Sequence, residues 1–422
     1  MRRLTLNLLK TGFLTAIATF ARLLSAFLVM KLVAVLAGPE GVAQLGQFMS
    51  LTALLVVFAG GGVGPGVVKY LAQFRDDAQS VQALISSALT FTLVSSLLMC
   101  VLVLVFSTDI SIWLLGGEEY KSLIVVLAVA QICVAFHNLI IAIINGMMDV
   151  KRLALVHVLG AVIGVVLPSV LGYFYKLYGV LLAFVLAQGL LLFVSFGCYA
   201  RSKYFNSSFL RPSVDRQMLS RLASFSLMTL TSALLAPIVQ IVVRNMLAEQ
   251  FSWEQVGYWQ AVSKVSEAYL LFISMAISVY YLPKLSSVHD RRGFTREIVM
   301  GYTVLMPIVL VSAAFVFILR GPITEVLFSD EFEGALYLYA PQLVGDVVKI
   351  ASFVLSYIML AKSMTKTFFL SELFFSCLYV VLVSVMSATF GLVGAMYAFI
   401  VNYCIYLVFT AVVAKIYIKG MP

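Results

Sequence analysis

The sequence predicts an all-α protein that crosses a membrane many times. Of its 422 residues, 62% are hydrophobic and 11% are charged, and the mean hydropathy is +1.06. A soluble domain needs far more charge on its surface. Apolar runs of more than about 20 residues, the length that spans a bilayer as a helix, recur along the chain.

Twelve of these runs are predicted as membrane-spanning helices. The first run is too long for the apolar part of a signal peptide, so we expect it to be kept as a span. The expected spans are 11–37, 42–70, 82–107, 121–147, 153–175, 178–200, 221–247, 254–282, 296–320, 334–361, 367–389 and 391–414.

Loop charge predicts the orientation of the spans. Most of the 28 Lys and Arg residues fall in loops on one side, whereas the opposite loops are mainly acidic. Basic loops stay in the cytoplasm, so both termini are expected there. This topology accounts for the net charge of +9, and we expect no nucleic-acid partner.

The chain also contains an internal repeat. The stretch 36-LAGPEGVAQLGQF-48 aligns without gaps on 247-LAEQFSWEQVGYW-259. Two halves of equal orientation are typical of alternating-access transporters, with a pseudo-twofold axis along the membrane normal. We expect a six-helix N-terminal lobe over 1–200, a cytoplasmic linker over 201–220 and a six-helix C-terminal lobe over 221–422.

Charged residues inside the spans are the leading functional candidates. A charge near mid-bilayer costs at least about 2.5–3.5 kcal/mol, so it usually faces a partner or a wet cavity. The candidates near the middle of a span are Arg22, Lys264, Glu267, Asp346 and Lys349. Lys31, Arg244 and Glu372 lie closer to span ends, where snorkelling to the interface is an equally good explanation.

Among these eight charges, the basic residues outnumber the acidic ones, which predicts a cavity that binds anions such as phosphate. The acids Glu267, Asp346 and Glu372 would tune its charge. The i, i+3 spacing also allows Lys264–Glu267 and Asp346–Lys349 to form ion pairs within their helices.

Uncharged polar residues extend the same helix faces. The expected cavity positions are Gln131, Asn138, Asn145, Gln260 and Gln342. The alternative is that they form polar contacts between helices, and this suits the Asn and Gln stripe of the fourth span better.

A glycine-rich stretch, 58-FAGGGVGPGVVKY-70, is a candidate hinge in the second span. Glycine and proline permit a kink or an unwound turn, and close helix packing explains them equally well. The predicted hinge residues are Gly60, Gly61, Gly62, Gly64, Pro65 and Gly66, and Pro237 is expected to kink the seventh span.

No enzyme-like arrangement stands out. The three histidines are scattered in the sequence, and no nucleophilic residue stands at a spacing from a basic residue that is typical of a catalytic site. We therefore expect no catalytic residue, metal site or cofactor.

Four segments carry a resemblance to a known family: 63-VGPGVVKYLAQF-74, 240-QIVVRNMLAEQFSWEQVGYWQAVSKVSEAYLLF-272, 279-VYYLPKLS-286 and 342-QLVGDVVKIASFVLSYIMLAK-362. With them the chain resembles the Wzx-type flippases of the polysaccharide-exporter branch of the MOP superfamily. It is most similar to the members that move enterobacterial common antigen units, and O-antigen flippases share the pattern.

The resemblance implies a V-shaped, two-lobed bundle of the MATE/MOP kind in the bacterial inner membrane. Such a protein moves undecaprenyl-diphosphate-linked oligosaccharide from the cytoplasmic to the periplasmic leaflet. It implies a cationic cavity, with charged positions at Arg22, Lys31, Arg244, Glu267, Asp346 and Lys349, whereas Lys264 stands where a small polar residue is expected. It leaves open coupling to a proton or sodium gradient and contacts with a polysaccharide polymerase and a chain-length regulator, and a monomer is expected.

Two other classes of membrane protein are the alternatives. A cation-coupled multidrug exporter of the MATE type is the alternative on the same fold, but a more acidic cavity is expected for cationic drugs. A membrane-embedded polysaccharide polymerase or ligase would need a large periplasmic loop, whereas the longest polar loop, 201–220, is predicted to be cytoplasmic.

Overall fold

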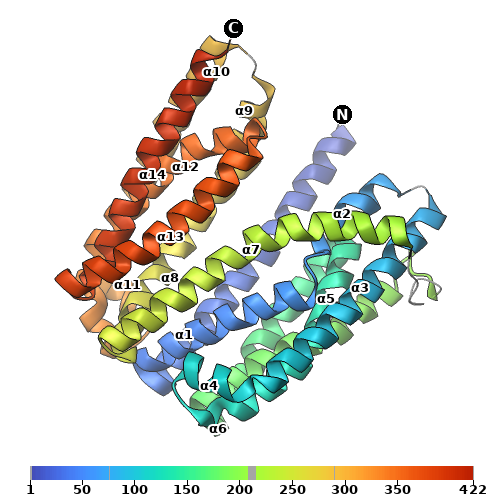
Figure 1. Cartoon of the computed structure of the whole chain (residues 1–422), viewed down its shortest axis with the longest axis horizontal. Helices are drawn as coiled ribbons and strands as arrows, with labels where there is room; N and C mark the ends of the chain where they lie inside the picture. Colours follow the sequence, from blue (N-terminus) through green and yellow to red (C-terminus); the bar gives the residue numbers. More distant parts are fainter. Residues whose placement is uncertain (1, 76, 208–214, 289, 422) are drawn as a thin grey trace. The chain divides into compact units, whose positions relative to one another are not determined.

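The computed structural model describes residues 2–75, 77–207, 215–288 and 290–421, and these residues form helices joined by short turns (Figure 1). The all-α fold is therefore confirmed. The helices of the first half are α1 (Arg2–Ala59), α2 (Gly64–Gln73), α3 (Ala78–Val105), α4 (Ser107–Leu115), α5 (Lys121–Gly146) and α6 (Val150–Ala200). A 3₁₀ turn at Glu118–Tyr120 precedes α5.

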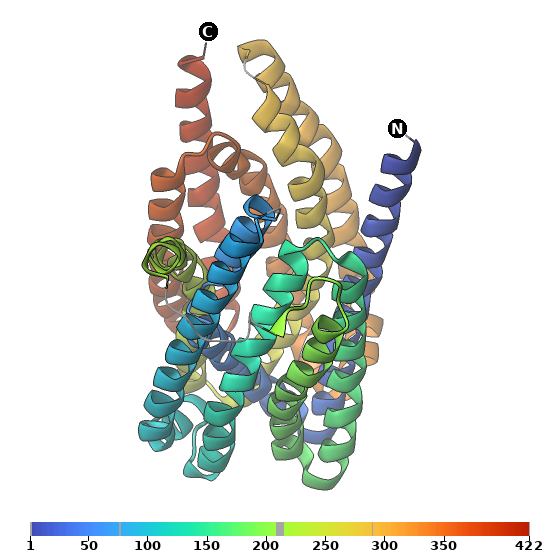
Figure 2. The same cartoon turned by 90° about the vertical axis from the view of Figure 1, so that its right-hand side faces the viewer.

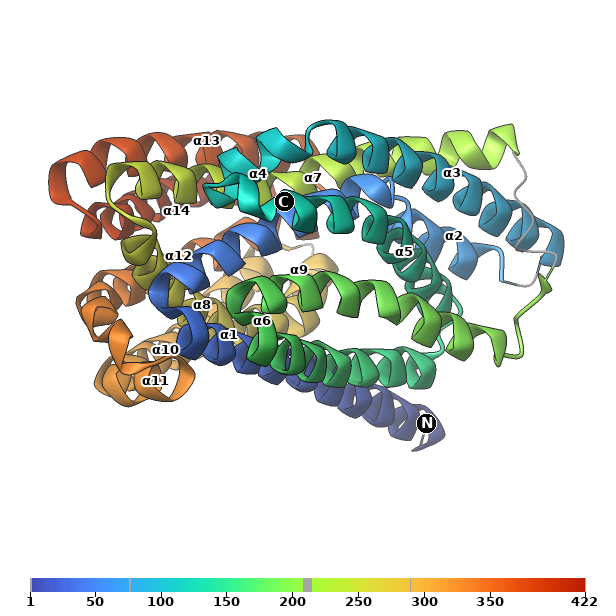
Figure 3. The ribbon, with the colours of Figure 1, turned by 90° about the horizontal axis from the view of Figure 1, so that it is seen from below.

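Two of these helices turn back on themselves. In α1 the turn lies at Gly38, whose φ of 61° and ψ of −161° suit glycine alone, and Pro39 begins the next segment (Figure 3). In α6 the turn lies at Tyr175 and Lys176 (Figure 2). α6 therefore contains two of the predicted spans, and α1 contains the first span, 11–37, with the first part of the second, 42–70.

The second half has its own series of helices. They are α7 (Arg216–Gln250), α8 (Trp253–Ala276), α9 (Leu282–Ser287), α10 (Arg291–Ile318), α11 (Arg320–Leu327), α12 (Tyr339–Ala361), α13 (Thr365–Phe390) and α14 (Val393–Lys419). A π-helical turn at Ile277–Tyr281 joins α8 to α9, and a 3₁₀ segment at Asp330–Leu338 precedes α12.

The order of elements reproduces the repeat predicted from the sequence. α10, α11 and α12 follow one another as α3, α4 and α5 do, and α13 with α14 corresponds to the two segments of α6. Backbone details repeat as well. Met148 before α6 and Ser363 before α13 both have positive φ, of 58° and 54°, and Lys176 and Gly391 do so between the following two segments.

Eight helices of the described residues are long and apolar enough to cross a membrane: 17–59, 78–105, 118–146, 150–200, 291–318, 330–361, 365–390 and 393–419. Each of the twelve predicted spans lies largely on helix, although the second, 42–70, is interrupted at 60–63 between α1 and α2. The chain is a multi-pass membrane protein, and the count of twelve crossings stays a prediction.

Contacts divide the chain into two compact units. Unit 1 comprises Met1–Ala37 and Leu45–Ile241, and unit 2 comprises Gly38–Gln44 and Val242–Pro422. The boundary thus lies inside α7 rather than in the predicted linker, of which 208–214 lie outside the described residues. The first part of α7 packs into unit 1, where Leu222 joins the core and the carbonyl of Ile241 accepts a hydrogen bond from Gln47.

The glycine-rich stretch breaks the helix, as predicted. α1 ends at Ala59, α2 begins at Gly64, and Gly61 and Gly62 have φ of 61° and 65°. Gly61 also packs closely, since a Cβ there would lie 2.3 Å from the ring of Phe91. Both explanations given for the stretch therefore apply, and its action as a hinge stays a prediction, as does a kink at Pro237 inside α7.

Candidate functional site

Asp346 of α12 is the centre of a buried polar network in unit 2. Its side chain is 0% exposed, and α8 supplies its main partners. Ser266 Oγ lies 2.7 Å from both carboxylate oxygens, and Tyr269 donates a hydrogen bond of 2.7 Å. Gln342, one turn earlier on α12, donates from its amide at 2.9 Å. Both oxygens of this carboxylate accept hydrogen bonds, and those from Ser266 and Tyr269 join α8 to α12.

Lys349 turns away from Asp346. Its Nζ lies 5.5–5.7 Å from the ring centroids of Phe353, Phe399 and Tyr403, an arrangement that stabilises a cation over aromatic faces. The Asp346–Lys349 ion pair that the i, i+3 spacing allows is not among the ion pairs of the described residues, although the two charges still interact electrostatically. The carboxylate faces hydroxyl groups of α8, whereas the ammonium lies among rings of α12 and α14.

Lys264 and Glu267 form the ion pair that their spacing predicted. Nζ and Oε2 are 2.6 Å apart, with the side chains 27% and 50% exposed. Glu267 also lies close enough to Arg244 and Lys349 to interact with both charges. It is the more accessible of the two acids on α8 and α12.

Arg244 lies at the end of α7 and is 3% exposed. Its Nε donates to Oε1 of Gln260 at 2.9 Å, and its guanidinium lies 6.0 Å from the ring centroid of Trp259. Glu372 of α13 is exposed and interacts electrostatically with Lys349. Unit 2 thus brings its predicted charges together from several helices, with three basic and three acidic groups in balance.

The predicted charges of unit 1 are basic only. Arg22 lines a pocket of about 210 Å³ between α1 and α6. The lining residues are Ala18, Thr19, Arg22, Val150, Leu153, Ala154 and His157. Among the described residues, Arg22 has no hydrogen bond or ion pair. Lys31 lies further along α1, half-buried, and is not among the lining residues.

The uncharged stripe of α5 does not form one polar surface. Gln131 is 1% exposed, and neither amide atom has a hydrogen-bond partner among the described residues. Asn138 is half-buried and Asn145 is exposed at the end of the helix. The three residues lie on one face of α5, but no hydrogen bond or ion pair of the described residues joins them to the other predicted site residues.

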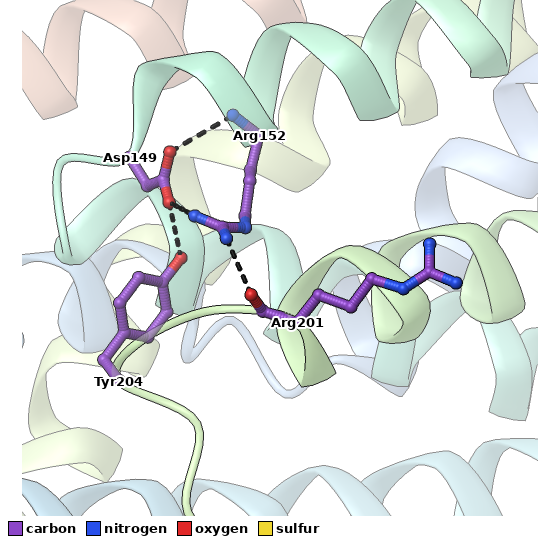
Figure 4. A network of polar contacts seen from close by, with 4 residues as sticks. All are labelled: Asp149, Arg152, Arg201 and Tyr204. Atoms are coloured by element: carbon purple, nitrogen blue, oxygen red, sulfur yellow. Dashed lines mark hydrogen bonds and ion pairs between the residues drawn. The ribbon is translucent and has the colours of Figure 1, made fainter.

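A polar network fixes the start of α6 beside the Arg22 pocket (Figure 4). Asp149 caps the helix by accepting from the backbone N–H of Arg152, and it also forms an ion pair with the Arg152 guanidinium. Arg152 donates further to the carbonyl of Arg201 at 2.8 Å, and Tyr204 donates to Asp149 at 3.3 Å. Because α6 turns back, its two ends meet in this network.

The charge of Asp149 is stabilised by the same contacts. Partial burial acts to raise its pKa, but the hydrogen bonds and charge of Arg152 outweigh this and hold the pKa below its ordinary value of 3.8. Burial raises the pKa of Tyr204 to about 12, so its hydroxyl remains a donor at neutral pH.

Sequence reasoning missed four residues of these sites: His157, Ser266, Tyr269 and Tyr403. His157 is one of three scattered histidines in the sequence, although 150, 153, 154 and 157 follow helical spacing on one face. Ser266 and Tyr269, three residues apart, also share a face. Tyr403 carries no such signal, since only the packing of α14 on α12 brings it to Lys349.

Comparison with known proteins gives consistent results. A family model described as "Polysaccharide biosynthesis protein" matches residues 19–337. Lipid III flippases of Escherichia coli (strain K12) and of Shigella flexneri are each 33% identical over 401 residues, covering 95% of this chain and 96% of theirs.

Solved structures share the fold. An inward-facing multidrug resistance transporter of the MATE family, MOP superfamily, has a TM-score of 0.82 at 15% identity, covering 94% of this chain and 95% of its own. The lipid II flippase MurJ, in an inward closed conformation, has a TM-score of 0.74 at 17% identity, covering 96% and 87%. At these identities the likeness concerns the fold alone.

Proposed function

Because this chain belongs to the family of polysaccharide biosynthesis proteins, we propose that it is a flippase for lipid-linked oligosaccharides. It moves undecaprenyl-diphosphate-linked repeat units, of the lipid III or O-antigen kind, from the cytoplasmic to the periplasmic leaflet of a bacterial inner membrane. The observation that carries this proposal is the relationship to lipid III flippases, which extends over 95% of the chain.

The geometry of the candidate sites supports an anionic substrate. The predicted charged residues of unit 2 are three basic and three acidic, whereas those of unit 1, Arg22 and Lys31, are both basic. A diphosphate needs cationic partners of this kind. In this proposal Arg22 and Arg244 engage the diphosphate as the protein alternates between inward-open and outward-open states.

The acids of unit 2 have separate roles in this proposal. Glu267 is half exposed and interacts with both Arg244 and Lys349, so a change in its charge would alter the balance at both cations. Asp346 keeps α8 joined to α12. Both termini lie in the cytoplasm, the protein acts as a monomer, and a polysaccharide polymerase and a chain-length regulator receive its product.

Transport in proteoliposomes tests the proposal. A fluorescent undecaprenyl-diphosphate oligosaccharide is supplied, and an impermeant quencher reports its leaflet, beside a cationic dye as control. Wild type, Arg22→Ala and Glu267→Gln are compared with and without a proton gradient. We expect movement of the lipid-linked sugar, with loss of most of the rate in Arg22→Ala.

Movement of the dye alone would reject the flippase and favour a multidrug exporter, the class that shares the fold at TM-score 0.82. If the gradient accelerates transport in wild type but not in Glu267→Gln, then Glu267 takes part in coupling. An equal response in both proteins assigns Glu267 to binding alone.

A further inference from the structure

The pocket in unit 1 is built from one face of each of two helices. α1 contributes Arg22 with Ala18 and Thr19, and α6 contributes His157 with residues one and two turns earlier. One turn further along, Ser25 Oγ donates to the carbonyl of Ala161 at 3.1 Å. This bond holds α1 against α6, so Arg22 and His157 are positioned on opposite walls of the same space.

The chemistry of the lining favours an anion. The remaining walls are aliphatic except for Thr19, and no carboxylate is among the lining residues. Asp149 lies next to Val150 in sequence, but its charge is engaged by Arg152 and Tyr204. Apolar walls strengthen electrostatic attraction, and a histidine ring adds a hydrogen-bond donor beside the guanidinium.

The size of the pocket limits the ligand. Sites that enclose drug-sized molecules measure about 300–1,000 Å³, so about 210 Å³ is too small for several sugars. It is sufficient for a phosphate group, whereas the oligosaccharide and the lipid tail would have to remain outside. The pocket therefore suits the junction between tail and sugar.

We propose that Arg22 and His157 together form a phosphate subsite for the lipid-linked substrate, with His157 as a positioning residue that donates a hydrogen bond to a phosphate oxygen. The inference rests on the proposed function and deepens it by assigning a role to His157. Arg152, although close in sequence, is excluded from this role because its guanidinium is held by Asp149 and the carbonyl of Arg201.

Equilibrium binding to the full-length protein in detergent, read by native mass spectrometry, tests the subsite. The probes are undecaprenyl diphosphate, undecaprenyl phosphate and undecaprenol, which share a tail and differ in charge. His157→Phe keeps the ring volume and loses the hydrogen bond, and we expect it to weaken undecaprenyl diphosphate binding about tenfold. Undecaprenol binding should not change.

Two further variants act as controls. His157→Gln restores a donor and should regain most of the affinity for undecaprenyl diphosphate. Leu155→Met changes an exposed residue of the same helix that does not line the pocket, with little change in volume, and should bind as wild type does. Equal affinity of wild type for undecaprenyl diphosphate and undecaprenol would overturn the subsite. So would a His157→Phe variant that binds normally while Arg22→Ala does not.

A measurement on the wild-type protein tests the subsite without requiring that any variant folds. Undecaprenyl diphosphate should slow chemical modification of His157 by diethyl pyrocarbonate, as localised by mass spectrometry, whereas undecaprenol should not. Modification at an unchanged rate would contradict the proposal. These outcomes can be distinguished from those of the transport assay. If binding depends on His157 but no transport occurs, the subsite is retained and the flippase function is rejected. If transport occurs but binding does not depend on His157, the flippase function is retained and the subsite is rejected.

Discussion

At the scale of single residues, Asp346 and Glu267 show how two acids in neighbouring helices differ. Asp346 is buried and receives hydrogen bonds from Ser266, Tyr269 and Gln342. Glu267 is half exposed, and among the described residues only Lys264 donates a hydrogen bond to it. A carboxylate with all its partners inside the protein contributes to structure, and an accessible one can exchange partners. We therefore expect stability to depend on the first and transport on the second.

Replacing Asp346 tests this division. In Asp346→Leu, buried polar groups on α8 and α12 lose their common partner, at about 1–3 kcal/mol for each group left unsatisfied. The apparent melting temperature in detergent, followed by tryptophan fluorescence, should fall clearly. Asp346→Asn keeps an acceptor and should fall less, and Glu267→Gln should melt near wild type. Wild-type melting of Asp346→Leu would show that this carboxylate does not join the helices.

A second prediction at this scale concerns acid stability. The pKa of Asp149 is lower in the folded protein than its ordinary value of 3.8, so its contribution to stability is present above about pH 4 and is lost as pH falls below that value. Asp149→Asn keeps the cap but not the ion pair. Between pH 6 and pH 3 its melting temperature should fall less than that of wild type. Parallel curves would contradict the role of the charge.

At the scale of elements, the turn inside α6 and the turn between α13 and α14 have nearly the same backbone shape. Lys176 has φ 50° and ψ −136°, and Gly391 has φ 68° and ψ −157°. This region is almost confined to glycine, and another residue there costs about 1–3 kcal/mol. The turn between α13 and α14 has glycine at this position, whereas the turn inside α6 has lysine.

Reciprocal substitutions test this difference. Lys176→Gly should stabilise the protein by about 1–2 kcal/mol, and Gly391→Ala should destabilise it by a similar amount, because a Cβ at Gly391 meets no atom within 4 Å and the effect is one of backbone alone. Lys176→Ala, which removes the charge but keeps the strained shape, should resemble wild type. Thermal unfolding in detergent measures all three, and stabilisation by Lys176→Ala would refute the explanation.

At the scale of the whole molecule, orientation is the remaining prediction. Ser286 near the end of α9 and Glu119 in the 3₁₀ turn before α5 are both exposed, and the charge rule puts them on opposite sides of the membrane. In a cysteine-free background, Glu119→Cys should react with an impermeant maleimide in intact spheroplasts. Ser286→Cys should react only after the membrane is opened. The reverse pattern would invert the proposed direction of transport.

Much of this architecture could be predicted from the sequence, because hydropathy and the repeat are local or periodic signals. The break at Gly61 and the Lys264–Glu267 pair were also predictable, since they depend on neighbours in the chain. The Asp346 network and the rings around Lys349 were not, because they depend on which helices pack together. His157 was missed because Arg22, which lines the same pocket, lies on another helix.

The positive φ angles at Met148 and Ser363 have a consequence for ancestry. Neither residue favours this conformation, and the two differ in chemistry, yet both lie at the same place in the order of elements. A shape that persists after its side chains have diverged indicates inheritance from one earlier turn, copied when a shorter gene was duplicated and fused. The two halves would then descend from one small helical protein that once worked as a pair of identical chains.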